Sequence, residues 1–574
     1  MSCLDKPVLE VKGLTTEFPT PNGAFHAVND VSITLYPGKT LCIVGESGSG
    51  KSVLSKSIMQ IVDRPGRISA GQVLLHRDTG TIDIATLNDR GGAIRSIRGK
   101  DVAMIFQEPM SSLSPVHTIG EQIGEVLRLH ERMSRKQARQ RTIELLRQVE
   151  IPNPEVSIDR YPFEYSGGMR QRAVIAMALA CNPAILIADE PTTALDLTIQ
   201  AEILALIKSL QEKRNMAVLF ITHDMSVVAE IADEIVVMRL GKVVESGCVF
   251  DVFENPRHDY TKSLLNAVRG LDRPSPRRLA MRDARPIGEP ILVARSVTKA
   301  FGPKATRFNR NPTQFLAVDA VDLDLMSGEN LGIVGESGSG KTTLGRCLQR
   351  VYDPSAGSIL YQSSTDGQIE LVGMRERDLR KPWRDIRTVF QDPFGSLNPR
   401  MTIGQIVAEP LLVAGDMTEQ AIRGRVCELL DMVGLPSSAM SRYPHAFSGG
   451  QRQRVSVARA IAPKPRVIIA DEATSALDVN LRTQILDLML ELQQQLGLSY
   501  VLISHDIAVV RYFCDRTAVM HRGKMVEIGP TEAICSNPVH PYTQSLLSAV
   551  LIADPRQRGN RVRTRYMPEV ATPR

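Results

Sequence analysis

Short, continuous apolar runs alternate with longer stretches of helical spacing along both halves of the chain. The runs include "LCIVG", "AILIAD" and "VLFIT", and none of them alternates apolar with polar residues. Continuous runs of this length are typical of parallel strands that are buried on both faces and joined by crossover helices. The pattern therefore predicts α/β domains with a mostly parallel sheet.

A second pattern replaces the first between "FQEP" and "SGG". The stretches "EQIGEVLRLH" and "SRKQARQRTIELLRQV" have helical spacing and no strand signal, and the region near 403–434 repeats this pattern. We expect a small helical subdomain to be inserted at about 108–165 in the first half and at about 392–447 in the second.

The two halves are copies of one unit. Matching segments include "AVNDVSITLYPGKT" with "AVDAVDLDLMSGEN", "YSGGMRQR" with "FSGGQRQR", and "FITHDMSVV" with "LISHDIAVV", in the same order in both halves. In each half 24 residues lead from the serine of "SGG" to the glutamate of "ADE", and 33 more lead to a histidine. Such repeats decide the architecture. We expect nucleotide-binding domains at 1–268 and 291–552, a basic, Pro-containing linker at 269–290 and a basic tail at 553–574.

The composition indicates folded domains and narrows the class of partner. Of the 574 residues, 43% are apolar and 23% are charged, as is usual for globular proteins. The net charge is +6, but the segments 269–285 and 553–574 each carry six Arg against two acidic residues, so the rest of the chain has no basic excess. We therefore expect no nucleic-acid partner. For the two basic segments we expect a solvated, mobile state, with contact to anionic lipid as the alternative.

The cysteines and the apolar runs bound the compartment. The eight cysteines lie at least 21 residues apart, so no CxxC pair exists for a zinc or redox site. We expect most of them to be small buried residues in a reducing compartment. The N-terminus has no signal-peptide pattern, and no run of about 18 apolar residues occurs. The sequence thus predicts a cytosolic or peripherally attached protein.

A glycine-rich loop occurs twice, as "GESGSGKS" and "GESGSGKT". Each copy fits G-x-x-x-x-G-K-[ST] between an apolar strand and a helical stretch, which is the context of a phosphate-binding loop rather than of a simple glycine turn. Lys51 and Lys341 would reach the β- and γ-phosphates, and the hydroxyls of Ser52 and Thr342 would ligate Mg²⁺. The loop residues expected to bind nucleotide are Gly45, Glu46, Ser47, Gly48, Ser49, Gly50, Lys51 and Ser52, and Gly335, Glu336, Ser337, Gly338, Ser339, Gly340, Lys341 and Thr342.

A carboxylate pair ends a buried strand in each half, in "AILIADE" and "VIIADE". Asp189 and Asp471 would hold Mg²⁺ through water. Glu190 and Glu472 would orient and polarise the attacking water as general base, because phosphoryl transfer depends on positioning and charge control. Solvated carboxylates at the strand ends are the structural alternative.

Two further polar residues accompany each carboxylate pair. Gln107 and Gln391, in "FQEP" and "FQDP", would touch the metal and the attacking water. His223 and His505 each follow an apolar strand and precede an Asp, and they would hydrogen-bond the γ-phosphate. Alone, each of the four side chains would be read as an ordinary surface or structural residue, and their equal spacing in both halves favours the functional interpretation.

The "SGG" segments form a second element that favours phosphate. Ser166 would cap the helix that follows it, and the free amide groups of the first turn would face an anion. One domain with two such sites would be redundant unless the second serves a neighbour, so we expect the two domains to pair head to tail. The residues concerned are Ser166, Gly167, Gly168 and Met169, and Ser448, Gly449, Gly450 and Gln451.

The order of P-loop, "FQ" loop, "SGG" signature, "ADE", "ALD" and His resembles the nucleotide-binding domains of ABC transporters, from about residue 8 to 550. The resemblance implies P-loop NTPase domains of ABC type with an added antiparallel β subdomain, and it implies ATP and Mg²⁺ as cofactors. In that family ATP lies between the P-loop of one domain and the signature of the other. Residues 45–52 would then pair with 448–451, and 335–342 with 166–169.

Two aromatic residues precede the P-loops, Phe18 and Phe301. The resemblance implies that they stack on adenine. A place in the apolar core is the alternative for both side chains.

The match narrows to the ATPase subunits of peptide and nickel importers, and within them to fused ATPases of glutathione import, on "MIFQEPMSSLSPV", "IADEPTTALD" and the closing "NPxHxYTxSLL". It implies an ATPase that couples hydrolysis to uptake of a peptide-like solute, glutathione or a di- or oligopeptide. Its partners would be two membrane permeases and a periplasmic solute-binding protein. It would lie peripherally on the cytoplasmic face of the inner membrane.

The chain departs from the family pattern at a few positions. Tyr165 and Phe447 replace the usual Leu of the signature, and Met169 stands where many members have Gln. The Cys-rich segment that some relatives carry after "HPYT" is missing, so we expect no iron–sulfur cluster. A fused sugar or opine importer remains an alternative, as does a soluble tandem ABC protein acting on ribosome or DNA, although the short linker and the missing CxxC disfavour the latter.

Overall fold

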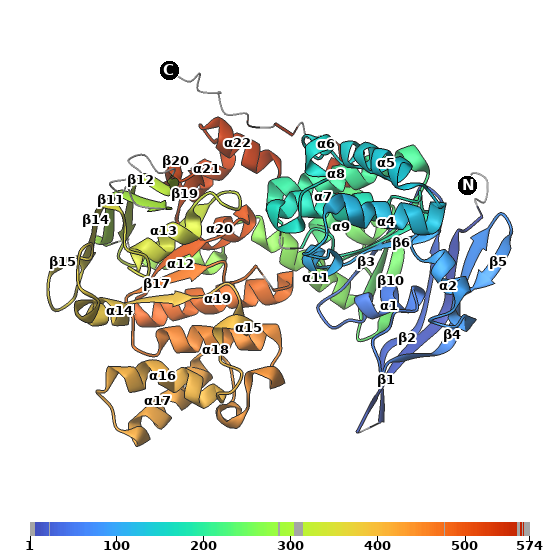
Figure 1. The fold of residues 1–574 in the computed structure, drawn as a ribbon. Helices are drawn as coiled ribbons and strands as arrows, with labels where there is room; N and C mark the ends of the chain where they lie inside the picture. The colour runs from blue at the N-terminus through green and yellow to red at the C-terminus, as the bar shows by residue number, and fades with distance from the viewer. Residues whose placement is uncertain are drawn as a thin grey trace, which may run out of the picture. The chain divides into compact units, whose positions relative to one another are not determined.

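The computed structural model describes residues 6–21, 23–193, 195–284, 288–302, 314–475, 477–559, 563–564 and 566. The described chain divides into two compact units. Unit 1 takes its residues from Met1–Leu195, Ile199–Asn266 and Leu551–Arg561, and unit 2 takes its residues from Asp196–Thr198, Ala267–Val550 and Val562–Arg574. Figure 1 labels the elements of both.

Unit 1 contains a six-stranded sheet in the order β10-β9-β3-β8-β7-β6, in which only the β9–β10 pair is antiparallel. Every residue of β3, β7 and β8 is buried, as their continuous apolar runs predict. The strands are β3 (Thr40–Val44), β6 (Val102–Ile105), β7 (Ile185–Asp189), β8 (Ala217–Thr222), β9 (Glu234–Arg239) and β10 (Lys242–Cys248). The predicted mostly parallel sheet is confirmed.

A second, antiparallel sheet of order β2-β1-β4-β5 packs against the first. Its strands are β1 (Leu9–Thr20), β2 (Gly23–Leu35), β4 (Arg67–Arg77) and β5 (Gly80–Asp83). Helix α1 (Lys51–Ile58) contributes to the shared core, where Leu14 of β1, Ile43 of β3 and Leu54 of α1 are all fully buried. This core fixes the start of α1 relative to the end of β3.

The region between β6 and β7 is built from helices. The N-caps Thr118 and Ser134 begin the two long helices α4 and α5 with capping boxes, in which each side chain accepts from a backbone amide three residues on. The remaining helices of the first half wrap its sheets. They are η1 (Ile84–Thr86), α2 (Gly92–Ile97), α3 (Pro109–Ser112), α4 (Ile119–Glu131), α5 (Arg135–Gln148), α6 (Pro154–Ser157), η2 (Pro162–Glu164), α7 (Gly167–Ala178), α8 (Leu197–Arg214), α9 (Met225–Ile231), α10 (Val249–Glu254) and α11 (Asp259–Leu271).

Unit 2 repeats this topology with sheets of order β16-β17-β18-β13-β19-β20 and β12-β11-β14-β15. The strands are β11 (Pro290–Phe301), β12 (Phe315–Met326), β13 (Asn330–Val334), β14 (Ala356–Gln362), β15 (Gln368–Glu370), β16 (Ile386–Val389), β17 (Val467–Asp471), β18 (Ser499–Ile503), β19 (Arg516–His521) and β20 (Lys524–Pro530). The helices are α13 (Lys341–Leu348), η3 (Glu376–Leu379), α14 (Arg380–Asp385), α15 (Pro393–Ser396), α16 (Ile403–Ala414), α17 (Glu419–Met432), η4 (Ser437–Ser441), η5 (Pro444–Ala446), α18 (Gly449–Ile461), α19 (Val479–Leu496), α20 (Ile507–Phe513), α21 (Thr531–Ser536) and α22 (Pro541–Ser548).

The segment expected to be a linker contains a helix, α12 (Pro276–Ala284), which packs on α19 in unit 2. Just before it, the amide of Ser275 donates to the carbonyl oxygen of Tyr512 at 3.0 Å. The Arg282 guanidinium forms an ion pair with Asp515, whose side chain is only 8% exposed. The segment expected to be a tail contributes η6 (Pro555–Gln557), which belongs to unit 1.

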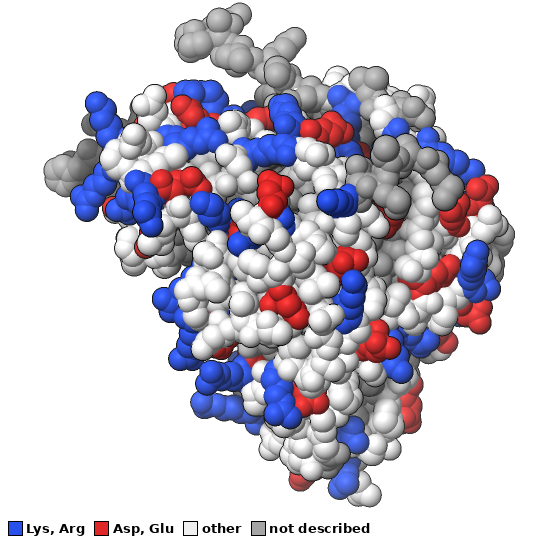
Figure 2. Space-filling view, turned by 90° about the vertical axis from the view of Figure 1, so that its right-hand side faces the viewer, with Lys and Arg blue, Asp and Glu red and all other residues white. Residues whose placement is uncertain are grey.

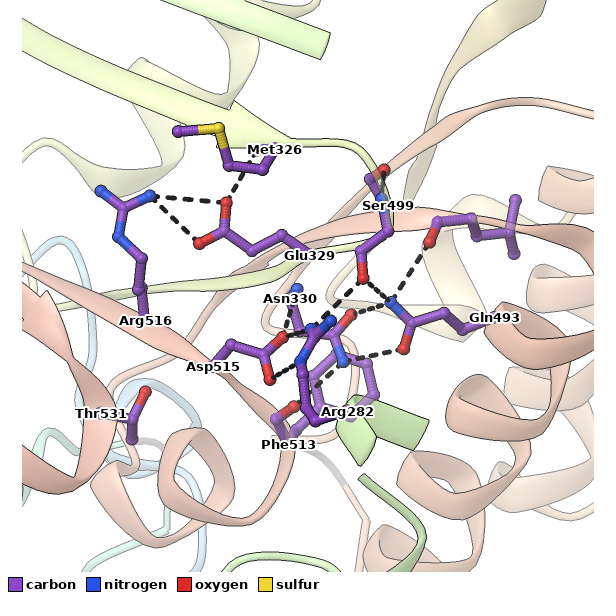
Figure 3. Close-up of polar contacts among 12 residues, drawn as sticks. Arg282, Met326, Glu329, Asn330, Gln493, Ser499, Phe513, Asp515, Arg516 and Thr531 are labelled. Atoms are coloured by element: carbon purple, nitrogen blue, oxygen red, sulfur yellow. Dashed lines mark hydrogen bonds and ion pairs between the residues drawn. The ribbon is translucent and has the colours of Figure 1, made fainter. Parts of the chain in front are cut away.

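Figure 3 shows the polar network into which Arg282 inserts. Asp515 also accepts from the amide of Asn330 at 2.8 Å. The Asn330 side chain donates to Gln493 at 3.0 Å and to the carbonyl oxygen of Phe513 at 3.1 Å. Helix α12 is therefore held to strand β13 through buried groups that each have a partner.

We expect Asp515→Asn to destabilise the protein by about 2–3 kcal/mol, because it leaves the half-buried Arg282 guanidinium without its anion. The control is Asp366→Asn, which removes the exposed pair with Lys381 and should cost less than about 1 kcal/mol. Urea denaturation of both variants measures the difference. Equal midpoints for the two variants would contradict the role of the Arg282–Asp515 pair.

Candidate nucleotide sites

The glycine-rich loops join β3 to α1 and β13 to α13. Gly50 adopts φ 99°, and a Cβ atom there would lie 2.2 Å from the carbonyl oxygen of Ala27, so only glycine fits. The same holds for Gly340 at φ 102°. Neither residue caps its helix with a side chain, so the amides of the first turn are free to meet an anion.

The lysine of each loop is buried and curls back over the loop. Lys51 is 5% exposed, and its Nζ donates to the carbonyl oxygens of Gly45 at 2.7 Å and Glu46 at 2.9 Å. Lys341 is equally buried and makes the corresponding bonds at 2.8 Å each. Burial lowers the pKa of Lys341, although neighbouring carboxylates oppose this shift.

A hydroxyl and a carboxylate meet beside each lysine. The Ser52 hydroxyl donates to Asp189 at the end of β7, and the Thr342 hydroxyl donates to Asp471 at the end of β17, both at 3.0 Å. Burial raises the pKa of both aspartates. The pairs present hard oxygen atoms of the kind that Mg²⁺ prefers.

The next residue along, Glu190, has a carboxylate held from three sides. Oε2 accepts from Gln107 Nε2 and from the Thr193 hydroxyl, each at 3.0 Å, and Oε1 lies 3.1 Å from His223 Nδ1. Burial alone would raise the pKa of Glu190. The hydrogen bond from His223 and the charges of His223 and Lys51 outweigh burial and lower the pKa to about 2.

Unit 2 repeats this arrangement around Glu472. Gln391 Nε2 donates to Oε2 at 2.7 Å, and His505 Nδ1 lies 3.3 Å from Oε1. The pKa of Glu472 is again lowered despite burial, mainly through His505. Each unit thus brings together the Gln, Glu and His that the sequence predicts.

Each signature begins a helix with its serine as N-cap. The Ser166 hydroxyl accepts from the amide of Met169 at 3.3 Å, and the Ser448 hydroxyl accepts from the amide of Gln451 at 3.4 Å. Ser166 was predicted to be such a cap, and the prediction is confirmed. Tyr165, which replaces the usual Leu, is 2% exposed and donates its hydroxyl to the carbonyl oxygen of Ser157 at 2.8 Å. The larger side chain therefore fits within the core.

The two predicted adenine-stacking residues lie on the antiparallel sheets. Phe18 of β1 is half-buried and faces Phe25 across the strand pair. Phe301, at the end of β11, is 39% exposed, and its ring meets Tyr352 edge-on at 5.5 Å between centroids. Its other neighbour is Lys299, whose Nζ lies 5.2 Å from the ring centroid.

One contact to the loops was not predicted. The Tyr260 hydroxyl accepts from the amide of Glu46 at 2.9 Å, and the Tyr542 hydroxyl accepts from the amide of Glu336 at 3.0 Å. The only signal in the sequence was the recurrence of "NPxHxYT" in both halves.

Two surveys of the described residues complete the picture. None of the helices that they form is long and apolar enough to span a membrane. Their His, Cys, Asp and Glu side chains form no group of three or more that is placed to hold a metal ion. On the face drawn in Figure 2, Lys and Arg side chains are interspersed with Asp and Glu side chains.

Comparison with known families and proteins gives consistent matches. A family model described as "ABC transporter" matches residues 28–193 and 318–475, and one described as "Oligopeptide/dipeptide transporter, C-terminal region" matches 244–291 and 526–573. A dimeric post-hydrolysis ATP-binding cassette bound to ADP and Pi is 30% identical, over 42% of this chain and 99% of that one, with a TM-score of 0.37.

Two curated relatives match over nearly the whole chain. The glutathione import ATP-binding protein GsiA of Escherichia coli O157:H7 is 48% identical, over 97% of this chain and 91% of that protein. The protein of the same name from Salmonella choleraesuis is 47% identical, over 97% and 92%. The resemblance inferred from the motifs is confirmed, and the chain belongs to the ABC transporter family as an ATP-binding protein with two cassettes, each followed by an oligopeptide/dipeptide transporter C-terminal region.

Proposed function

We propose that this chain is the ATP-hydrolysing subunit of an importer for a peptide-like solute, either glutathione or a di- or oligopeptide. The observation that carries the proposal is the repeated arrangement around Glu190 and Glu472, in which a buried, ionised carboxylate sits between Gln and His beside a P-loop. The solute class is supported by the names of the two relatives. Two membrane permeases and a periplasmic solute-binding protein are the proposed partners, at the cytoplasmic face of the inner membrane.

The phosphates of ATP are bound by the loop amides and the buried lysine. Lys51 already lies within the loop, and it needs only to exchange carbonyl oxygens for phosphate oxygens. Ser52 and Asp189 would hold Mg²⁺, because their oxygens are 3.0 Å apart. Mg²⁺, when bound, neutralises charge on the phosphates. Thr342 and Asp471 take these roles in unit 2.

Glu190 and Glu472 position the attacking water. A carboxylate with a pKa of about 2 is ionised at neutral pH, so Glu190 accepts a hydrogen bond from water and polarises it. Gln107 holds the carboxylate in place, and His223 is placed to reach the γ-phosphate. The signature helices α7 and α18 supply further amides to the phosphates of the opposite site, and Phe18 and Phe301 stack on adenine.

We expect the double variant Glu190→Gln/Glu472→Gln to retain ATP but to lose at least about 100-fold in hydrolysis rate, since the amide cannot polarise water as the carboxylate does. Phosphate release and equilibrium ATP binding measure the two effects separately. Glu131→Gln, a change at the end of α4, is the matched control and should hydrolyse ATP normally. Normal turnover in the double variant would remove both glutamates from catalysis.

Lys51→Ala is expected to weaken nucleotide binding at one of the two sites, because Lys341 still serves the other. Isothermal titration calorimetry should show two classes of site where the unmodified chain shows two strong ones. Lys56→Ala, which removes an exposed lysine from the same helix, should leave both intact. Unchanged affinity at both sites in Lys51→Ala would show that the loop assignment is wrong.

The solute is tested with the permeases and the solute-binding protein encoded beside this chain. In proteoliposomes, we expect ATP hydrolysis to rise when the binding protein carries glutathione or a short peptide. Loading the same binding protein with a sugar serves as the control. Stimulation by the sugar alone would favour the alternative of a sugar importer over the peptide importer.

A further inference from the structure

The motif that closes each half, "NPRHDYT" and "NPVHPYT", is not accounted for by the ATPase chemistry. It opens α11 in the first half and α22 in the second. Its tyrosines are buried, with Tyr260 6% and Tyr542 2% exposed. Buried tyrosines place their hydroxyls on a polar partner, and here the partner is a nucleotide loop.

The same hydroxyl-to-loop bond occurs in both copies. The amide of Glu46 donates to the Tyr260 hydroxyl across 214 residues of sequence, and the amide of Glu336 donates to the Tyr542 hydroxyl across 206. The two bonds differ by only 0.1 Å, at 2.9 Å and 3.0 Å. Two halves that differ at many other positions thus keep this contact.

The tyrosine and the loop lysine hold opposite ends of one peptide group. The carbonyl oxygen of Gly45 accepts from Lys51 Nζ at 2.7 Å, and the amide of Glu46, which belongs to the same peptide bond, donates to Tyr260 at 2.9 Å. When Lys51 turns to the phosphates it releases that carbonyl oxygen. The tyrosine is then the contact that continues to fix the peptide plane.

A short chain of hydrogen bonds places the tyrosine. Glu245 of β10 accepts from the amides of Arg257 at 2.8 Å and His258 at 3.0 Å, and His258 Nδ1 accepts from the amide of Tyr260 at 3.1 Å. Unit 2 repeats each bond. There Glu527 accepts from the amides of Val539 at 2.8 Å and His540 at 3.1 Å, and His540 Nδ1 accepts from the amide of Tyr542 at 3.1 Å.

The rings themselves are also held. The guanidinium carbon of Arg239, at the end of β9, lies 5.0 Å from the Tyr260 ring centroid. The equivalent residue His521, at the end of β19, has its ring centroid 4.1 Å from that of Tyr542. Because the ring is packed and its backbone is capped, the direction of the hydroxyl is set before nucleotide arrives.

We propose that Tyr260 and Tyr542 are positioning residues for the nucleotide loops, and that each closing motif keeps its loop in the ATP-binding shape while the lysine exchanges partners. The inference rests on the proposed ATP site at these loops. It gives the oligopeptide-type C-terminal region a specific task, which is to support nucleotide affinity at the P-loop of its own half.

The test is the double variant Tyr260→Phe/Tyr542→Phe in the full chain, which keeps both rings and removes both hydroxyls. We expect the KM for ATP to rise about fivefold or more, because two loop amides lose their acceptor. We expect kcat to change less than about twofold, since Glu190 and Glu472 are untouched. An unchanged KM in a chain that still hydrolyses ATP would overturn the positioning role and leave the proposed function standing.

A matched control separates positioning from general stability. Tyr361 is fully buried and donates its hydroxyl to Asp385 at 2.7 Å in the antiparallel sheet of unit 2. Tyr361→Phe should lower the unfolding temperature as much as the tyrosine variants do while leaving the KM for ATP unchanged. An equal rise of KM in Tyr361→Phe would overturn the proposal.

Rescue at the capping histidine provides the second readout. His540→Asn retains a side-chain acceptor at the N-cap of α22, and His540→Ala removes it. We expect His540→Ala to raise the KM of one site and His540→Asn to restore it to within about twofold of the unmodified chain. Equal KM values for the two variants would contradict the hydrogen-bond chain. Lack of ATP hydrolysis by the unmodified chain would instead overturn the proposed function.

Discussion

A buried ammonium group at the start of one helix constrains each half of the chain. Removing a charge from water is costly unless polar groups replace the water, and the loop does so by turning the carbonyl oxygens of Gly45 and Glu46 towards Lys51. That turn requires glycine at position 50, where a side chain would collide with Ala27. The same charge helps to keep Glu190 ionised. The loop, the helix and the strand-end carboxylates therefore depend on one another.

The two halves agree at the sites and diverge where the chain only needs a paired charge. In unit 1 Lys39 lies 3.8 Å from Asp233. In unit 2 the residue at the lysine position is Glu329, which pairs with Arg516 at 3.1 Å. Asp515, the counterpart of Asp233, thus needs another cation, and Arg282 of α12 supplies it. The reversed charge explains why this helix docks on unit 2.

The sequence was sufficient to place the site, but not everything that supports it. The strands, loops and carboxylates follow from local patterns, and equal spacing in two copies identified Gln107 and His223. Helix α12 was hidden because its prolines suggested a break, yet Pro276 stands at the first helical position, where proline is tolerated. The Tyr260 contact joins residues 214 positions apart, so no local pattern could specify it.

The low pKa of Glu190 restricts how the proposed mechanism can work. A carboxylate held at a pKa of about 2 is a weak proton acceptor, so before nucleotide arrives it can orient water but gains little by deprotonating it. The γ-phosphate brings negative charge, which raises the pKa of a neighbouring carboxylate. His223, which holds Oε1 at 3.1 Å, is also the residue expected to turn to that phosphate. Both changes make Glu190 more basic only when ATP is present, so the empty site does not activate water.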